Sequence, residues 1–575
     1  MKVRSTSPQR IFSLPGIFCL VFMFAVLILP AASAQEVAEP DMEQADQAAT
    51  DDETESLPLS PTEKAEMEGT AVELSLQDII RLAMQNNIDI AVDEIGQQSS
   101  QLSFMSAQAA WDPSLRGSLG ISSRKSANTN RFDSSLEEVN SSKTVDWSAN
   151  FSQPVKLTGG TLSASYSGSR ATSNSNSTLY NPNFQGRTNV QFSQPLLKNL
   201  KIDSNRSQIK IRKIDLDIRD SQFRRTVSST ISQITRQYWD LVSAIRNYDI
   251  QRNALELAQR NLRDVKKKVE VGTLAPIEIT QASYQVAQTR LRLINAEDQI
   301  HRQMNSMRQY ISDDRHNNIW SKVIIPTDTP EFQEFKIDEA LAIETALANR
   351  PELKQIDLQL KQSDIQLKLA RNNRRWGVDL SASFNTSGSA GNYVCDPSQA
   401  FCVEPPDYQT GGFAQAFRNM FDGRFTGWSF SVDLQVPIRN RSNDIALANQ
   451  LIQRRQTELN RKKQEQSIQV ELRNAVQTVE TSRQQVETAK LNRELAQEQL
   501  DGENKRFEAG LSEFYRVLDQ QNRLAEAENG ELSALIDYKK SVISLQDSMN
   551  TLLEYNDVKI STSASDHIPD LKIFE

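Results

Sequence analysis

Two hydrophobic periods alternate along this chain, and the alternation occurs twice. Apolar residues three or four positions apart fill about 203–310 and about 440–554, which is the spacing of one face of a helix. Apolar residues at every second position, the spacing of a strand, occur within about 114–194 and about 378–436. A shorter helical segment precedes each set of strands. Both halves therefore predict the same order of elements, a short helix, strands and then two very long helices.

The long helical segments have the pattern of coiled coils. Leu255, Ala258, Leu262, Val265 and Val269 step by 3, 4, 3 and 4 residues, and the later segments repeat this spacing. At ~1.5 Å per residue, a helix that fills the second long segment would be on the order of 100 Å long. These segments are rich in Gln, Arg, Glu and Lys. We therefore expect helices that stand in water, and the sequence after the N-terminal leader contains no candidate transmembrane helix.

The strand segments have one apolar and one small polar face. In the clearest one, Val145, Trp147, Ala149 and Phe151 alternate with Asp, Ser and Asn. Either a soluble sandwich or a membrane barrel has this period, and segments of about ten residues with an uncharged polar face favour the barrel. The first half contains four strand-like runs and the second half two. These runs are Ser114–Ser123, Val145–Val155, Thr161–Arg170, Thr188–Gln194, Val378–Asn385 and Gly427–Val436.

The repetition defines two structural repeats, 74–330 and 331–556. Matched landmarks such as Trp111 and Trp376 lie about 240–265 residues apart, far too long a period for a solenoid. The strands of a single chain, six by the runs given above, cannot close a barrel alone, because closure needs at least about eight. The fold class is therefore an α+β membrane protein, in which long antiparallel helices form an α-barrel and the strands contribute to a β-barrel shared between subunits. Such an assembly would be a conduit.

Each half predicts a tight turn between its two long helices. Gly272 and Gly510 each follow the end of a long helical segment, and Pro276 lies shortly after the first of them. Glycine after a helix end accepts a left-handed conformation, and proline is tolerated in the first turn of a helix. We therefore expect two helical hairpins whose turns lie far from the strands.

The N-terminus predicts export. Lys2, Arg4 and Arg10 precede an apolar run that ends at Leu29, and small residues follow it, which is typical of a signal peptide over 1–34. Residues 35–73 hold 13 Asp or Glu and one Lys, which indicates an acidic, disordered leader. The chain carries a net charge of −9, and the leader accounts for it, so no basic surface indicates nucleic-acid binding. Residues 557–575 read as a C-terminal tail.

Two cysteines remain after the signal peptide. Cys395 and Cys402 lie in a segment rich in Gly, Pro and aromatic residues. In an exported protein this pair indicates a disulfide that would hold a surface loop, and two unpaired thiols are the alternative.

An enzyme is not indicated. The three histidines, His301, His316 and His567, are scattered and suggest no metal cluster, and the sequence shows no phosphate loop, nucleophile elbow or zinc spacing. We expect no cofactor and no metal. The alternative outside the channels is an exported trimeric adhesin, which has a coiled coil and one strand anchor at one end of the chain. Strands in the middle of both halves argue against it.

Several motifs resemble the TolC-like outer-membrane efflux proteins, or outer-membrane factors, over about Val72 to Asn556. They occur in the order of that family, and those that open and close a repeat occur twice. The motifs are Leu74-Ser75-Leu76-Gln77-Asp78-Ile79, Phe335-Lys336-Ile337-Asp338-Glu339-Ala340-Leu341, Gln194-Pro195-Leu196-Leu197, Arg506-Phe507-Glu508-Ala509-Gly510 and Val517-Leu518-Asp519.

The resemblance implies a homotrimer in the outer membrane whose helices extend into the periplasm. It implies contact with outer-membrane lipid, a periplasmic adaptor protein and an inner-membrane pump. The function implied is an exit channel for a tripartite efflux or type I secretion system. The family usually has twelve strands per trimer, whereas six strands per protomer would give eighteen.

The resemblance also implies an aperture at the periplasmic tip, ringed by aspartates that follow the glycine turn. Asp519 matches one of these aspartates, but the other position holds Arg516, and the first half offers Glu278 and Gln281. A pairing of Arg516 with Asp519 or Glu278 would latch the tip, and an ordinary exposed ion pair is the alternative. Phe507 matches an aromatic residue near the entrance, and burial between helices is the other reading of it.

Overall fold

The computed structural model describes residues 57–127, 139–175, 178–313, 318–336, 338–394 and 405–558. The chain divides into two units after Ser56, and all described residues belong to the second unit. None of the helices in these ranges has the length and apolar character needed to cross a membrane.

The first half has short helices, four strands and two long helices, in that order. Its elements are α1 (Pro61–Glu68), β1 (Ala71–Leu74), α2 (Leu76–Asn86), α3 (Ile88–Gln108), η2 (Ala109–Trp111), β2 (Ser114–Ala127), β3 (Val139–Pro154), β4 (Thr161–Ser173), β5 (Tyr180–Pro195), α4 (Ser204–Glu270), α5 (Ile277–Ile311), η3 (Asn318–Ser321) and β6 (Val323–Pro326).

The second half repeats this order with one strand hairpin instead of two. Its elements are α6 (Glu339–Asn349), α7 (Pro351–Asn373), β7 (Gly377–Tyr393), η4 (Asp407–Gln409), α8 (Phe413–Phe421), β8 (Thr426–Gln435), α9 (Arg441–Glu508), α10 (Phe514–Met549) and α11 (Leu552–Tyr555). The long helices match closely in length, with 67 and 35 residues in α4 and α5 and 68 and 36 in α9 and α10. The predicted duplicated α+β fold is confirmed.

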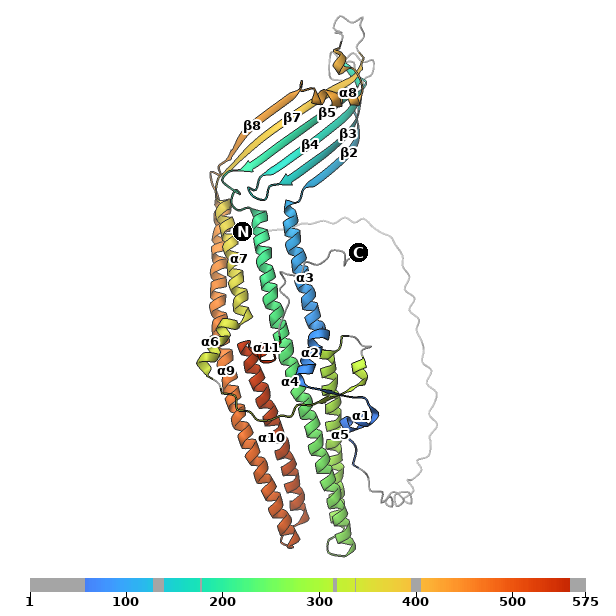
Figure 1. The fold of residues 1–575 in the computed structure, drawn as a ribbon, viewed down its shortest axis with the longest axis vertical. Coiled ribbons are helices and arrows are strands. Elements are labelled where there is room, and N and C mark those ends of the chain that lie inside the picture. Colours follow the sequence, from blue (N-terminus) through green and yellow to red (C-terminus); the bar gives the residue numbers. More distant parts are fainter. Residues whose placement is uncertain are drawn as a thin grey trace, which may run out of the picture. The chain divides into compact units, whose positions relative to one another are not determined.

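All six predicted strand segments join one antiparallel sheet in the order β2-β3-β4-β5-β7-β8. The pairing of β5 with β7 brings the two halves together, from Tyr180–Tyr393 to Pro195–Asp379. Figure 1 shows the sheet at one end of the long helices, with α3, α4, α7 and α9 all leading to it. The strands extend beyond the predicted runs, because Ser- and Asn-rich ends, whose alternation is weak, still pair in register.

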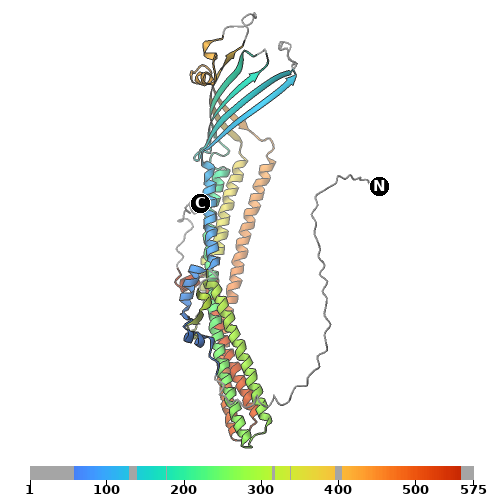
Figure 2. The same ribbon diagram turned by 90° about the vertical axis from the view of Figure 1, so that its right-hand side faces the viewer.

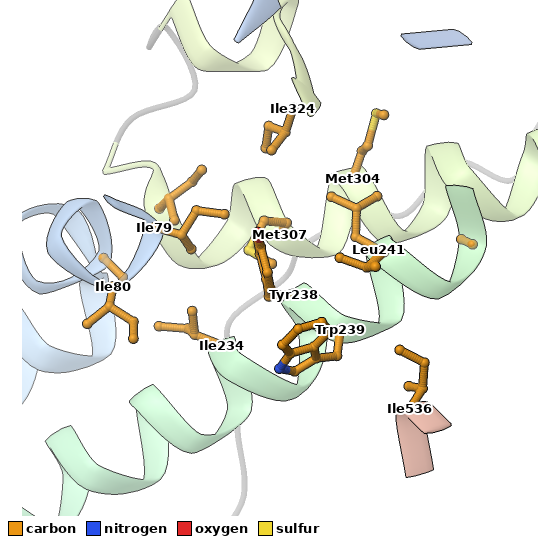
Figure 3. Packing of buried hydrophobic residues seen from close by; sticks show 14 of the residues in the cluster. Ile79, Ile80, Ile234, Tyr238, Trp239, Leu241, Met304, Met307, Ile324 and Ile536 are labelled. Carbon is orange, nitrogen blue, oxygen red and sulfur yellow. The ribbon is translucent and has the colours of Figure 1, made fainter. Parts of the chain in front are cut away.

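The largest core lies where the short helices meet the long ones. Tyr238 and Trp239 of α4 pack with Ile79 of α2 and Met307 of α5, and Ile536 of α10 belongs to the same buried cluster. Figure 3 shows these side chains converging from the four helices. Burial of apolar surface at about 25 cal/mol per Å² makes this junction a main source of stability.

A short parallel pair of strands closes the first half. Ala71 of β1 pairs with Val323 of β6, and the register continues to Leu74 and Pro326. The segment that follows β6 leads to the second half and is held by tyrosines from both halves. Tyr238 donates a hydrogen bond of 2.7 Å to Asp328, and Tyr538 donates one of 3.0 Å to the carbonyl of Gln333.

The disordered leader predicted over 35–73 is wrong for its last part, because residues 61–74 form α1 and β1. Ser60 caps α1 in a capping box with Glu63, and Gly69 ends the helix with a φ of 71°. The guanidinium of Arg252 on α4 donates hydrogen bonds of 2.8 and 3.0 Å to both oxygens of Glu63. The acidic composition concealed this capping signal. Residues 35–56 of the predicted leader lie outside the described residues.

Candidate functional site

The six-stranded sheet has one apolar and one polar face. Trp147, Ala149 and Phe151 of β3 pair with Gly168, Tyr166 and Ala164 of β4, so all six point to one side. The intervening pairs, such as Ser148 with Ser167, point to the other side. Large apolar residues on the edge strands are exposed, with Ile121 of β2 at 80% and Trp428 of β8 at 81%. A sheet that leaves its apolar face exposed is suited to lipid on that side and water on the other.

The edges of this sheet are strands β2 and β8, and neither pairs with a further strand among the described residues. Burial is also lowest there, since every residue of β2 is exposed. Each edge presents unpaired backbone N–H and C=O groups, which in a membrane must pair with another strand. The chain therefore supplies one segment of a larger sheet.

The opposite end of the helices carries the two turns. Gly272 has a φ of 78° and Gly510 a φ of 73°. The N–H of each glycine bonds to the carbonyl three residues before it, and the next N–H bonds five residues back, as Thr273 does to Lys268 at 2.8 Å. This Schellman arrangement ends each long helix and reverses the chain. Figure 2 shows both turns at the end remote from the sheet.

An apolar cluster joins the two helical hairpins near these turns. Phe514 and Leu518 of α10 are buried together with Val265 of α4 and Ala282 of α5. Phe507 packs against this cluster, with its ring centroid 5.7 Å from that of Phe514. It is half-buried between helices, and Lys268 lies 4.5 Å from the centre of its ring.

Polar side chains join the same hairpins next to the apolar cluster, and the sequence reasoning missed them. Asn522 of α10 accepts hydrogen bonds of 2.7 Å from Gln285 and 3.1 Å from Arg292, both on α5. Asn261 of α4 donates a bond of 2.7 Å to Gln521. We call these five residues the tip seam. No local motif marks them, because their pairing depends on which faces of α4, α5 and α10 meet.

The predicted aperture residues lie on α5 and α10 close to the turns. Asp519 pairs with Arg523, with 2.9 Å between the nitrogen and oxygen atoms. On a helix, an acidic residue four positions before a basic one is the better arrangement. This explains why Asp519 pairs with Arg523 rather than with Arg516. Among the ion pairs of the described residues, none joins Arg516 to Asp519 or Glu278.

The first-half residues contribute differently. Gln281 is exposed on α5, whereas Glu278 in the first turn of that helix is partly buried. One carboxylate oxygen of Glu278 is buried without a hydrogen-bond partner.

A buried carboxyl joins the halves further from the tip. Asp547 of α10 accepts a hydrogen bond of 3.1 Å from Ser228 of α4. Burial raises the pKa of Asp547 above its ordinary value, and the hydrogen bond from Ser228 and the charges of Arg236 and Arg350 oppose this rise.

The disulfide candidates Cys395 and Cys402 lie outside the described residues, as do His316 and His567. Within the described ranges, no group of three His, Cys, Asp or Glu side chains could hold a metal ion.

A sheet with one lipid-facing and one polar face, continued by duplicated long helices, defines a class of proteins: subunits of channels that join a membrane barrel to a helical tunnel. The family described as outer membrane efflux protein matches residues 159–312 and 342–551. The chain belongs to this family, and its place is the outer membrane, from which the helices extend into the periplasm. The predicted family and localisation are confirmed.

Solved structures have the same fold. The chain is similar to CusC, with a TM-score of 0.60 and 15% identity over 84% of this chain and 93% of that one. For the CmeC outer membrane channel of Campylobacter jejuni the TM-score is 0.59, with 15% identity over 87% and 90%. For the open state of the MtrE outer membrane channel of Neisseria gonorrhoeae it is 0.56, with 15% identity over 84% and 91%. No curated protein matches the sequence.

Proposed function

We propose that three copies of this chain form one conduit, the exit duct of a tripartite efflux or type I secretion system. A periplasmic adaptor protein and an inner-membrane pump would complete the system. The observation that carries the proposal is the six-stranded sheet with two unpaired edges and an exposed apolar face. Six strands are fewer than the eight or so that a closed barrel needs, and three copies supply eighteen.

The helices support the same assembly. Each chain contributes two hairpins, α4 with α5 and α9 with α10, that are nearly equal in length. Three chains therefore supply six similar hairpins, which suits a tube with near six-fold symmetry. The polar face of the sheet would line the barrel and the helices would continue its wall into the periplasm.

The tip seam is the candidate gate of this conduit. It joins the second-half helix α10 to the first-half helices α4 and α5 by hydrogen bonds between neutral amides, with one guanidinium added. Each bond between amides contributes a net of about 0.5–1.5 kcal/mol, and the bond from the guanidinium about 1.5–3 kcal/mol. A seam of this strength holds the hairpins together, yet a partner that binds the tip could separate them.

Single-channel recording in planar bilayers tests the proposal. We expect small or brief currents from the wild-type trimer and a roughly tenfold higher ratio of open to closed time from Gln285→Ala/Asn522→Ala, because ~1.4 kcal/mol of bonding lost from the closed state corresponds to a factor of ten in this equilibrium. Gln477→Ala is the matched control, since Gln477 bonds only within its own helix, to Thr481. Silence from wild type and double variant alike would favour an adhesin and reject the conduit.

A further inference from the structure

Helix α8 lies on the apolar face of the sheet, at the end away from the long helices (Figure 1). Ala416 and Met420 are fully or almost fully buried against the strands, and Asn419 donates a hydrogen bond of 2.9 Å to the carbonyl of Ser389 on β7. Helix α8 is therefore docked on the sheet.

The strands are shaped to receive this helix. Trp147, Gly168, Gly186 and Gly388 face one another across β3, β4, β5 and β7 and form a single row. A Cβ on Gly388 would lie 2.1 Å from the carbonyl oxygen of Ala416, and one on Gly186 would lie 2.6 Å from the sulfur of Met420. Only glycine permits this approach, so the row is a seat for α8.

A stripe of phenylalanines runs along α8 beside its buried side. Phe413, Phe417 and Phe421 follow one another at four-residue spacing, and their exposed fractions rise from 36% through 43% to 71%. Neighbouring rings lie 6.1 and 5.1 Å apart. Phe413 also packs edge-on against Trp147 of the sheet. An aromatic stripe that continues an apolar sheet face indicates contact with acyl chains.

Basic residues lie just beyond the stripe. Arg170 is two residues past Gly168 and Lys143 four past Trp147, both away from the long helices, which is about 7 and 13 Å at ~3.3 Å per residue. By the two-residue period both belong to the apolar face. Arg418 is exposed on α8 beside Phe417, with Asp422 near it. Basic residues at this level of a barrel face the headgroups, where phosphates are the available anions.

We propose that α8 is an interfacial helix of the outer leaflet. Its phenylalanine stripe lies among acyl chains, and Lys143, Arg170 and Arg418 bind the phosphates of an anionic lipid. This inference rests on the proposed barrel, whose apolar face would be the outside. A neighbouring protomer does not cover the phenylalanine stripe, because it would pair with the edge strands β2 and β8. Helix α8 packs instead on β5 and β7, which are inner strands of the sheet.

Spin labels in vesicles test the position of α8. In a variant whose Cys395 and Cys402 are replaced by serine, a label at Phe421→Cys is expected to collide with oxygen more than with a water-soluble nickel complex. Phe430→Cys on the apolar face and Ser431→Cys on the polar face are the matched controls. A lipid-exposed label at 430 with a water-exposed or fully protected label at 421 would overturn the α8 proposal alone. Water exposure at both positions would reject the barrel itself.

Lipid selectivity tests the basic group. We expect the wild-type trimer to immobilise spin-labelled phosphatidic acid in preference to phosphatidylcholine, and Lys143→Gln/Arg170→Gln/Arg418→Gln to lose that preference. The control Arg116→Gln/Arg124→Gln/Arg187→Gln removes the same charge from the polar face and should keep the preference. Equal loss in both triple variants, or no preference in the wild type, would overturn specific phosphate binding.

Discussion

One ion pair on α10 contributes to the charge of the proposed aperture, together with Arg516 and Glu278. Asp519 and Arg523 are in contact, although their side chains stay 38% and 60% exposed. Such a pair contributes under ~1 kcal/mol to stability. Its effect on a conduit is electrostatic instead, because a guanidinium beside each carboxylate cancels much of the negative field that three Asp519 side chains would project into the lumen.

Removal of Arg523 should therefore raise the affinity of the proposed aperture for cations. We expect a trivalent cation such as hexaamminecobalt(III), added on the tip side, to block Arg523→Ala at roughly 3- to 10-fold lower concentration than wild type, since a trivalent ion and a unit charge ~12 Å apart interact by about 1 kcal/mol in water. The measurement is the concentration that halves the single-channel current. In Arg523→Ala/Asp519→Asn the blocking concentration should return towards that of wild type. An unchanged blocking concentration in Arg523→Ala would show that Asp519 does not line the aperture.

Residue-level prediction from the sequence depended on how local the signal was. Gly272 and Gly510 follow helix ends, and a positive φ there depends on a few neighbouring residues. Asn522 and Arg292 carry no such signal, because their contacts join helices about 230 residues apart. Resemblance to a family proposed Asp519 for the aperture, and that role stays a prediction. It did not indicate the partner Arg523, which pairs with Asp519 because the two lie four residues apart on α10.

Among the elements, α1 shows how a short helix is held by charge. Ser60 and Glu63 bond to each other across the first turn, and Arg252 bonds to Glu63 from α4. The backbone N–H of Ser60 and then the hydrogen bond from Arg252 lower the pKa of Glu63 below its ordinary 4.5. The stability that Glu63 contributes is thus fully present above 4.5 and is lost as the pH falls through the lowered value.

Acidification or neutralisation of Glu63 should therefore release α1. We expect amide exchange in residues 61–68 to be roughly 2- to 5-fold faster in Glu63→Gln at neutral pH. The glutamine keeps an acceptor for the Ser60 N–H but loses the negative charge that the helix N-terminus and Arg252 favour, a charge worth ~0.3–1 kcal/mol. Wild type should approach the variant below pH 4.5. Hydrogen exchange read by mass spectrometry checks both, with the exposed Glu66→Gln as control. Equal protection in wild type and Glu63→Gln at neutral pH would show that the charge of Glu63 does not stabilise α1.

The elements differ in how far the sequence predicted them. The long helices and all six strands follow from periods sustained over many residues, so their existence was predictable and only the strand ends moved. Helix α8 has nine residues inside a segment rich in glycine and aromatics, too short for a period to emerge. Its place depends on Gly186 of β5 and Gly388 of β7, which lie about 200 residues apart, a contact that exists only after the sheet forms.

For the whole molecule, the strand number sets the width of the barrel. Six strands per chain predict eighteen in the trimer, and barrel diameter grows about linearly with strand number. This barrel should therefore be about one and a half times as wide as the twelve-stranded barrel that the family resemblance implies. The extra hairpin comes from the first half, where β2 and β3 precede β4 and β5, so the duplication is unequal where the chain meets the membrane.

The central claim is that β2 of one chain pairs with β8 of the next until three chains close a ring. Cysteine cross-linking in the outer membrane tests it directly, with Cys395 and Cys402 replaced by serine, Ser118→Cys on β2, and Ser429→Cys, Ser431→Cys or Asp433→Cys on β8 in turn. These positions all belong to the polar face. We predict that one of the three pairs gives linked species that stop at three chains. No cross-link at any position, or a ladder that continues past three chains, would contradict the account.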